Sequence, residues 1–402
     1  MCIRDSSNES GATLTNRGAR TLLVNQSGAT LTNDGVGTNL VNQSGAVLTN
    51  SAGSVIVNQN GATLSNSASI LNNGNINNSA NFIITSTGTV SGTGTFTQLG
   101  GSTAAAAGSS ITQGTIAINA GKLDLAGNAT ATTSFSIGSS GTVNFSGGSI
   151  SANVTNAGTF NVTGTGTRTV TGDFTNEGTV KTTDTTAAFT GMFTNNGAYI
   201  SDPSTNIFGS LTVGANGYLA GGSGDVFQIL GDFYNDSTQT ALWDTSYAKL
   251  IFDDGDGLTA TTHTMSLAGK NLGSGPHDDN FDWGIFELIA GDSLTFISNG
   301  QTDPNRAFYA ALFLLDGGLS QISSITSPFD IYYNVDLDGN AYLKGATYGF
   351  AGGGSLIAYD PTPNDGSVPE PGTLLLVIGG LIAAVWRRHS VTQLSHGVFI
   401  SR

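Results

Sequence analysis

The chain of 402 residues contains 57 glycines and 10% charged residues, with a formal net charge of −15 at pH 7, yet 38% of its residues are hydrophobic. This composition is too apolar for a highly charged disordered chain. With only 13 lysines and arginines, the chain also lacks the clustered cations that nucleic-acid binding requires. Its single cysteine, Cys2, excludes an internal disulfide and a cysteine-based zinc site.

The first six residues, Met1 to Ser6 (MCIRDS), resemble the in-frame translation of a transposase end sequence used to build sequencing libraries. We interpret residues 1–6 as an adapter artefact and expect the true N-terminus to lie upstream. An exported protein begins with a basic stretch and an apolar core of about 7 to 15 residues. No such core occurs in the first 20 residues. Because truncation would remove it, this observation does not argue against export.

A repeat begins directly afterwards. Related segments start at Asn8 (NESGATLTNRG), Asn25 (NQSGATLTNDG), Asn42 (NQSGAVLTNSAG) and Asn58 (NQNGATLSNSA), with spacings of 17, 17 and 16 residues. Self-similarity at a fixed period indicates stacked units. Short alternating runs between Asn and Gly corners predict strands joined by tight turns.

The period lengthens farther along the chain without being lost. An Asn-x-Gly turn recurs with its asparagine at positions 156, 176 and 195. We predict a parallel β-solenoid (β-helix) over residues 7–238, in which each coil hydrogen-bonds to its neighbours and inward apolar side chains form a thin core. Recurring apolar positions argue against a disordered low-complexity tract. Charged side chains are scarce between residues 21 and 160, so we expect the flanks to carry Ser, Thr and Asn ladders.

The composition changes near residue 225. Residues 225–360 hold 18 of the 28 acidic residues and many of the aromatic ones. Apolar runs such as AKLIF, LTFIS and FDIYYNVDL predict strands of an antiparallel or capping β region over residues 239–358. A solenoid needs a cap to cover its last core layer. The segment 359–367 is rich in Pro, Asp and Gly, which is typical of a linker.

An apolar run from Thr373 to Trp386 follows the linker. Its 14 residues fall short of the roughly 17 to 25 that cross a hydrocarbon core as a helix. It also lacks the polar residues at every third or fourth position that a core helix shows. The run is preceded by a Pro-Glu-Pro element and followed by two arginines, which are Val368, Pro369, Glu370, Pro371, Arg387 and Arg388.

The order of elements in residues 368–388 resembles the PEP-CTERM sorting signal of exported Gram-negative proteins. The segments from His263, Asp279 and Tyr342 are also similar to the C-terminal regions of β-solenoid proteins that carry this signal. The resemblance implies that an exosortase cuts near Pro369-Glu370-Pro371. It further implies a short helix that holds the chain in the inner membrane before processing, with the arginines on the cytoplasmic side. Family members usually end soon after the basic cluster, so residues 389–402 are either a genuine tail or a reading error.

Few residues suggest site chemistry. His277, Asp278 and Asp279 are interpreted as a solvated acidic loop, because no second histidine at helical spacing accompanies them. Two acidic segments could offer oxygen ligands to calcium, but neither has the alternating acids and distant Glu of an EF-hand loop. We interpret both as turns and predict no metal site and no cofactor. These weak calcium candidates are Asp253, Asp254, Asp256, Asp336 and Asp338.

These observations predict a non-enzymatic, exported structural or adhesin-like protein of the cell surface or of an extracellular polysaccharide matrix such as a biofilm. Its expected partners are the exosortase, extracellular polysaccharide and, before processing, the membrane. The alternative is a polysaccharide-active β-helix lyase or hydrolase, which needs clustered carboxylates and basic residues in a groove. The best candidates for such a groove are Asp173, Glu177 and Asp184 with Lys181. We interpret them as flank residues and predict no catalytic residues.

Overall fold

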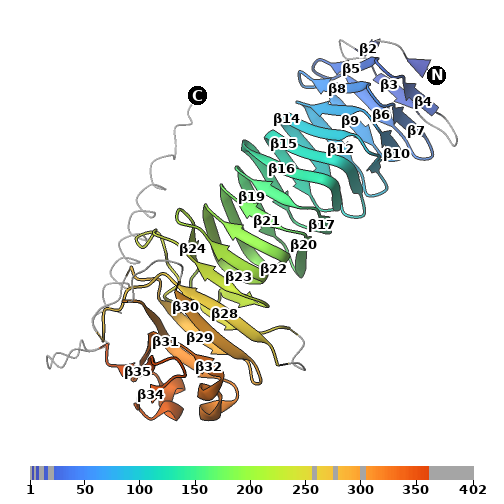
Figure 1. Ribbon diagram of the computed structural model, residues 1–402. Helices are drawn as coiled ribbons and strands as arrows, with labels where there is room; N and C mark the ends of the chain where they lie inside the picture. Colours follow the sequence, from blue (N-terminus) through green and yellow to red (C-terminus); the bar gives the residue numbers. More distant parts are fainter. Residues whose placement is uncertain are drawn as a thin grey trace, which may run out of the picture. The chain divides into compact units, whose positions relative to one another are not determined.

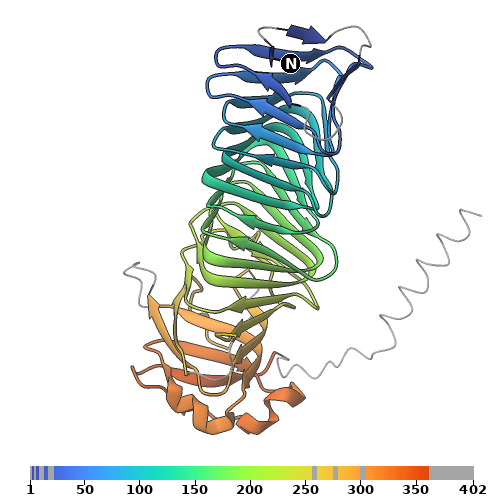
Figure 2. The same ribbon diagram turned by 90° about the vertical axis from the view of Figure 1, so that its right-hand side faces the viewer.

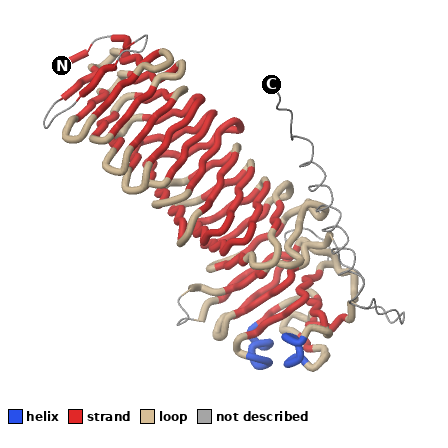
Figure 3. The backbone as a smooth tube through the Cα atoms, turned by 180° about the vertical axis from the view of Figure 1, so that it is seen from behind, coloured by secondary structure: helices blue, strands red, loops and turns tan. Residues whose placement is uncertain are grey.

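The computed structural model describes residues 2–3, 6–8, 13–16, 22–255, 260–274, 279–298 and 305–361 (Figure 1). Strands dominate this part of the chain, and the successive coils that they form are seen from the side in Figure 2. The predicted parallel β-solenoid is confirmed. Two short 3-10 helices, inserted between strands of the last coils, lie together at this end of the solenoid (Figure 3). No helix in the described ranges combines the length and the apolarity needed to cross a membrane.

The first coils are built from short strands. Their bounds are β1 Cys2–Ile3, β2 Ser6–Asn8, β3 Thr13–Asn16, β4 Leu22–Asn25, β5 Thr30–Asp34, β6 Asn39–Asn42, β7 Val47–Asn50, β8 Val55–Gln59, β9 Thr63–Asn66, β10 Ser69–Asn72, β11 Asn75–Asn78, β12 Asn81–Ile84 and β13 Thr89–Ser91.

Longer strands that bend around a corner are frequent in the middle coils. The bounds here are β14 Thr95–Ala105, β15 Ser110–Leu125, β16 Asn128–Phe145, β17 Ser149–Ser151, β18 Val154–Asn156, β19 Thr159–Thr163, β20 Thr167–Thr171, β21 Phe174–Asn176, β22 Thr179–Asn195, β23 Ala198–Val213, β24 Tyr218–Ala220, β25 Val226–Ile229 and β26 Phe233–Asn235.

The last coils carry the 3-10 helices η1 and η2. Their bounds are β27 Lys249–Phe252, β28 Thr262–Leu267, β29 Trp283–Leu288, β30 Ser293–Ser298, β31 Ala307–Leu315, η1 Gly318–Ser324, β32 Ile325–Thr326, β33 Asp330–Asn334, η2 Asp338–Leu343, β34 Tyr348–Gly349 and β35 Ser355–Tyr359.

Each N-terminal coil has three strands. β4 pairs in parallel with β7, and β7 with β10, which places Leu22 opposite Val47 and Val47 opposite Ser69. One coil therefore takes 25 residues and the next takes 22. The 17-residue sequence repeat contains only two strands, such as β5 and β6 in the repeat that begins at Asn25. The repeat therefore covers two sides of a three-sided coil, and equivalent corners fall on different sides in successive repeats.

In the middle of the chain, the sequence spacing and the coil coincide. Asn156 lies opposite Asn176, and Asn176 lies opposite Asn195. These offsets of 20 and 19 residues are the spacings of the Asn-x-Gly turn in the sequence. Stacking of this turn on itself, which the sequence predicts, is therefore confirmed.

Phenylalanine side chains fill the core of these coils. Alternate residues of each strand point inward, as expected of a pleated strand. The ring centroids of Phe160 and Phe174 are 5.1 Å apart, those of Phe174 and Phe193 are 5.0 Å apart, and those of Phe193 and Phe208 are 5.2 Å apart. All four side chains are fully buried. The rings thus form one continuous column along the solenoid, which we call the aromatic stack, with parallel rings at Phe174–Phe193 and edge-to-face contacts at the other two pairs.

Asparagine ladders run inside the solenoid at the corners of the coils. Asn156 donates from Nδ2 to Oδ1 of Asn176 at 2.8 Å, and Asn176 donates in the same way to Asn195 at 2.8 Å. Each side chain is fully buried and also donates to a backbone carbonyl, as Asn176 does to Ala198 at 2.9 Å. We expected asparagine ladders on the flanks, whereas these lie inside. The amides satisfy the corner carbonyls that an apolar core could not.

A column of glycines completes the Asn-x-Gly corner. A Cβ atom on Gly178 would lie 2.2 Å from the carbonyl oxygen of Gly158, and one on Gly197 would lie 2.2 Å from that of Gly178. Real Cβ atoms essentially never approach so closely. The backbone atoms of adjacent coils therefore leave no room for a side chain at this corner.

Gly178→Ala is expected to reduce the free energy of unfolding by about 1 to 3 kcal/mol, because the added methyl group must displace backbone of the preceding coil. Urea unfolding followed by circular dichroism measures this loss. Gly222→Ala is the matched control, since a Cβ there has no neighbour within 4 Å. Equal unfolding midpoints for the two variants would contradict the account of the glycine column.

The parallel stacking continues through the acidic C-terminal region. β27 pairs with β29, β29 with β31, β31 with β33 and β33 with β35, all in parallel. Lys249 lies opposite Ile285, so this coil takes 36 residues, because longer loops are inserted between the strands. The sequence predicted either an antiparallel or a capping β region over residues 239–358, and the antiparallel alternative is wrong. Among the named strand pairs of the described residues, β34 with β35 is the antiparallel one, and it lies at this end with η1 and η2.

Candidate functional site

A row of polar side chains crosses four neighbouring strands on the outside of the middle coils. The strand register places Asp124 of β15 opposite Asn144 of β16, Asn144 opposite Asn161 of β19, and Asn161 opposite Lys181 of β22. We call this row, with the outward threonines beside it, the polar face. Asn144 donates from Nδ2 to Asp124 Oδ1 at 2.6 Å, and Asn161 donates to Asn144 Oδ1 at 2.9 Å.

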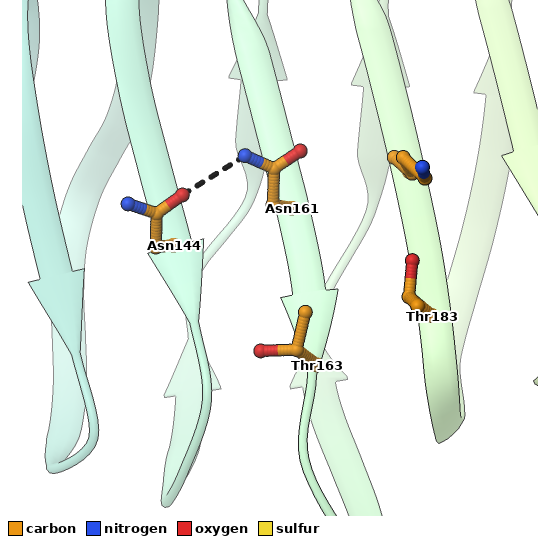
Figure 4. Close-up of a pocket in the computed structure, with 5 residues that line it drawn as sticks. Asn144, Asn161, Thr163 and Thr183 are labelled. Carbon is orange, nitrogen blue, oxygen red and sulfur yellow. Dashed lines mark hydrogen bonds between the residues drawn. The ribbon is translucent and has the colours of Figure 1, made fainter. Parts of the chain in front are cut away.

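A pocket of about 350 Å³ opens on the polar face (Figure 4). It is lined by Asn144, Asn161, Thr163, Lys181 and Thr183. Figure 4 shows that the asparagine and threonine side chains come from neighbouring strands, with the hydrogen bond between Asn144 and Asn161 at one side. The lining therefore offers two amides, two hydroxyls and one ammonium group. It contains no carboxylate and no aromatic ring.

Two ion pairs border the pocket, and the distance between ammonium nitrogen and carboxylate oxygen differs between them. Lys122 Nζ lies 2.8 Å from Asp124 Oδ2. Lys181 Nζ lies 3.8 Å from Asp202 Oδ2, and these two side chains are 45% and 65% exposed. Such an exposed and distant pair contributes little to stability, since solvent and salt screen it. Lys181 can therefore exchange Asp202 for another anion at low cost.

The environment of Asp124 keeps that carboxylate ionised. Partial burial alone would raise the pKa of Asp124. The hydrogen bonds from Asn144 and Lys122, together with the Lys122 charge, outweigh this effect and lower the pKa below its ordinary value. Folding lowers the pKa of Asp124, so these contacts stabilise the folded state at any pH above the unfolded-state pKa. The stabilisation is lost as the pH falls through the folded-state pKa.

Arg168 of β20 adds a second positive charge beside the pocket. Its Nε donates to the carbonyl of Thr163 at 3.2 Å, and a terminal nitrogen donates to the carbonyl of Thr165 at 2.7 Å. Residues 126–248 contain two basic side chains, Arg168 and Lys181. Both therefore contact or border the pocket of this acidic chain.

The structure separates the acids that were considered for glycan cleavage. Asp173 precedes β21 and Glu177 follows it, while Asp184 lies at the next corner, with a positive φ of 49°. Asp173 and Glu177 are four residue steps apart, which is about 13 Å of extended chain, whereas paired carboxylates of glycosidases lie roughly 5 to 9.5 Å apart. Two of the acids also have local roles, as Glu177 accepts a hydrogen bond from Asn196 at 2.7 Å and Asp173 accepts one from the Met192 amide at 3.0 Å. Lys181 alone of this set lines the pocket.

The calcium candidates that the structure describes lie in loops between strands or at the start of η2. Asp253 accepts hydrogen bonds from Gln228 at 2.9 Å and from the Gly255 amide at 2.8 Å. Asp254 accepts one from Thr261 at 2.7 Å. Asp336 and Asp338 are exposed, with Asp338 in the first turn of η2. Within the described ranges, no three His, Cys, Asp or Glu side chains are grouped to hold a metal ion. Asp256, His277 and Asp278 lie outside these ranges.

A buried His–Asp pair escaped the sequence reasoning, which assigned no role to His263. Its Nδ1 lies 2.7 Å from the carbonyl oxygen of Gly231, and its Nε2 lies 3.3 Å from Asp292 Oδ2. Both side chains are buried, and the Thr261 amide donates to Asp292 Oδ1 at 2.9 Å. Because a carbonyl oxygen only accepts, Nδ1 carries a hydrogen. His263, in β28, thus joins the loop that holds Gly231 to the loop that holds Asp292, and its burial indicates a structural role.

The sorting residues Val368, Pro369, Glu370, Pro371, Arg387 and Arg388 lie outside the described residues, as does the helix expected over 373–386. Comparison with known families matches residues 367–388 to the PEP-CTERM protein-sorting motif. Neither the curated proteins nor the solved structures gave a match to the chain. The motif identifies an exported protein that an exosortase sorts, as the resemblance in the sequence implied.

Proposed function

We propose that this PEP-CTERM protein is a non-enzymatic structural component of the cell surface or of the extracellular polysaccharide matrix. In this proposal the exosortase removes the C-terminal helix, and the solenoid then acts in contact with polysaccharide. The observation that carries the proposal is the construction of the solenoid. Its coils are joined by hydrogen-bonded ladders and stacked rings, and its flanks present hydroxyl and amide groups with few charges.

Such a construction suits a scaffold. Each coil contacts only its neighbours, so the stacked sheets transmit force along the solenoid axis. Polar, largely uncharged flanks are compatible with a hydrated sugar matrix and give little long-range attraction to other proteins. The separate corners that hold Asp173, Glu177 and Asp184 argue against the alternative, a lyase or hydrolase, because its acids must act on one bond.

The sorting experiment tests the proposed route. In a host that contains an exosortase, we expect mass spectrometry to find a C-terminus near Pro369-Glu370-Pro371 and the protein in the surface or matrix fraction. Glu370→Ala is expected to retain the segment up to Arg388 and to leave the protein in the inner-membrane fraction, because the processing element is altered.

Asp365→Ala removes a nearby acid outside the Val368–Pro371 element and is the matched control, for which normal processing is expected. If the wild-type protein keeps Arg387 and Arg388 in this host, the segment is an anchor and the proposed processing is wrong. If the processed protein is found only in the periplasm, the surface and matrix role is wrong.

A further inference from the structure

We propose that the pocket on the polar face binds a carboxylate group of an acidic polysaccharide, with Lys181 as its charged contact. This inference rests on the proposed function, because that function places the solenoid in contact with polysaccharide. It goes further in naming the site and the chemical class of sugar, a uronic acid.

The lining fits this ligand in size and in chemistry. A volume of about 350 Å³ lies within the range of about 300 to 1,000 Å³ that small-molecule sites occupy. An ammonium group forms a charge-assisted hydrogen bond to a carboxylate. Asn161, Thr163 and Thr183 line the same pocket and offer donors and acceptors for sugar hydroxyls. Since the lining has no aromatic ring, it offers a neutral sugar no stacking surface.

Lys181 is the more available of the two lysines on the polar face. Lys122 is closely paired with Asp124, which also accepts a hydrogen bond from Asn144. Lys181 Nζ is 3.8 Å from Asp202 Oδ2, so its ion pair is the looser of the two. The Arg168 guanidinium donates to the carbonyl of the lining residue Thr163 and so adds a second positive charge near the pocket. At physiological ionic strength, charges beyond about 8 Å are screened, so the distant acids of the chain repel a carboxylate at Lys181 only weakly.

The flanking residues suit a polymer rather than a single sugar. Thr142, Thr159 and Thr179 lie opposite one another on β16, β19 and β22 and form a column beside the pocket. Adjacent strands are about 4.8 Å apart, so the column presents a hydroxyl at each coil. An extended chain running along the solenoid axis, across the strands, would place successive sugars against successive coils. The carboxylate at Lys181 would then fix the position of the chain.

The test measures binding of short oligogalacturonates to the purified full chain at pH 7 by isothermal titration calorimetry. Neutral maltooligosaccharides of the same length are the ligand control. We expect binding of the acidic oligomer alone. Lys181→Ala is expected to weaken it about tenfold and Thr183→Val about fivefold, as for the loss of one charged and one neutral hydrogen bond. Circular dichroism checks that each variant is folded.

Two further variants separate a specific contact from damage to the fold. Asp202→Asn is expected to tighten binding up to about fivefold, because it removes the anion that competes for Lys181. Lys270→Ala makes the same charge change as Lys181→Ala at an exposed position outside the polar face, and it should bind as the wild type does. A loss of structure cannot produce opposite effects at Lys181 and Asp202.

The pocket is not the site if Lys181→Ala binds as Lys270→Ala does, if Asp202→Asn fails to tighten binding, or if the neutral oligomer binds equally well. Absence of any binding by the wild-type chain also overturns this inference, while the sorting experiment still decides the proposed function. Recovery of shortened oligogalacturonates would overturn the non-enzymatic role instead.

Discussion

Phe193→Ala is expected to lower the free energy of unfolding by about 3 to 5 kcal/mol, as for other large buried aromatic residues. The Phe193 ring is fully buried and lies within aromatic-contact distance of several others. Its centroid is 4.7 Å from Phe189, 5.0 Å from Phe174, 5.2 Å from Phe208 and 5.4 Å from Tyr199. Removal of the ring opens a cavity that three successive coils share. The hydrogen bonds between these coils limit how far the surrounding residues can move to fill it.

Hydrogen exchange is the informative measurement, because a solenoid can unfold coil by coil rather than in one step. Amides of β21, β22 and β23 should lose protection first in Phe193→Ala. Met192→Ala is the matched control, since Met192 is the adjacent residue and is 53% exposed. We expect it to change stability by less than about 0.5 kcal/mol. Similar effects of the two substitutions would show that the aromatic stack does not carry the stability of these coils.

Asn176→Asp is expected to cost about 3 kcal/mol or more at pH 7, although the two side chains have nearly the same shape. The Asn176 amide donates to Asn195 and to the Ala198 carbonyl, and its oxygen accepts from Asn156. An ionised carboxylate loses both donations and places a charge against two acceptor oxygens. The Asn156 amide and the Gly178 N–H still donate to one carboxylate oxygen, but the other oxygen has no donor and faces the two acceptors, so the change costs more than the loss of one hydrogen bond.

The same variant should show a characteristic pH dependence. Burial and the facing oxygens raise the pKa of the introduced carboxyl group in the folded state above its unfolded value of about 3.9. The folded state therefore binds the proton more tightly than the unfolded state does. The loss of stability of Asn176→Asp relative to the wild type is thus smallest below about pH 4 and grows as the pH rises through the folded-state pKa. Unfolding midpoints measured across this range test the effect. Asn216→Asp, at an exposed turn, should show none of it.

The fold was predictable from the sequence wherever the repeat and the coil have the same length. The Asn-x-Gly turns at 156, 176 and 195 stack on one another with the spacing that the sequence shows. Farther toward the N-terminus the repeat comprises two strands, and only the structure reveals that three strands close a coil. Periodicity reports the strand-and-corner unit, whereas the number of sides depends on how far the chain turns at each corner.

The candidate site was less accessible to sequence reasoning. Lys181 was noted only as a flank residue beside possible catalytic acids, and Asn144 and Asn161 were not singled out. Asp124, Asn144, Asn161 and Lys181 are separated by 20, 17 and 20 residues, because corners of different length lie between them. Their alignment follows from the hydrogen-bond register alone. The inward position of the asparagines was missed for a related reason, since a polar residue at a corner is ordinarily expected to face solvent.

The mismatch between repeat and coil limits how the N-terminal part of the chain can change in copy number. Loss or duplication of one 17-residue repeat would shift the following chain by two sides of a three-sided coil. At the junction, each strand would then lie against a strand from a different side of the coil. Three repeats occupy nearly the same length as two 25-residue coils. Insertions and deletions in this segment should therefore be tolerated in sets of three repeats, which makes the length of the solenoid adjustable in steps of two whole coils.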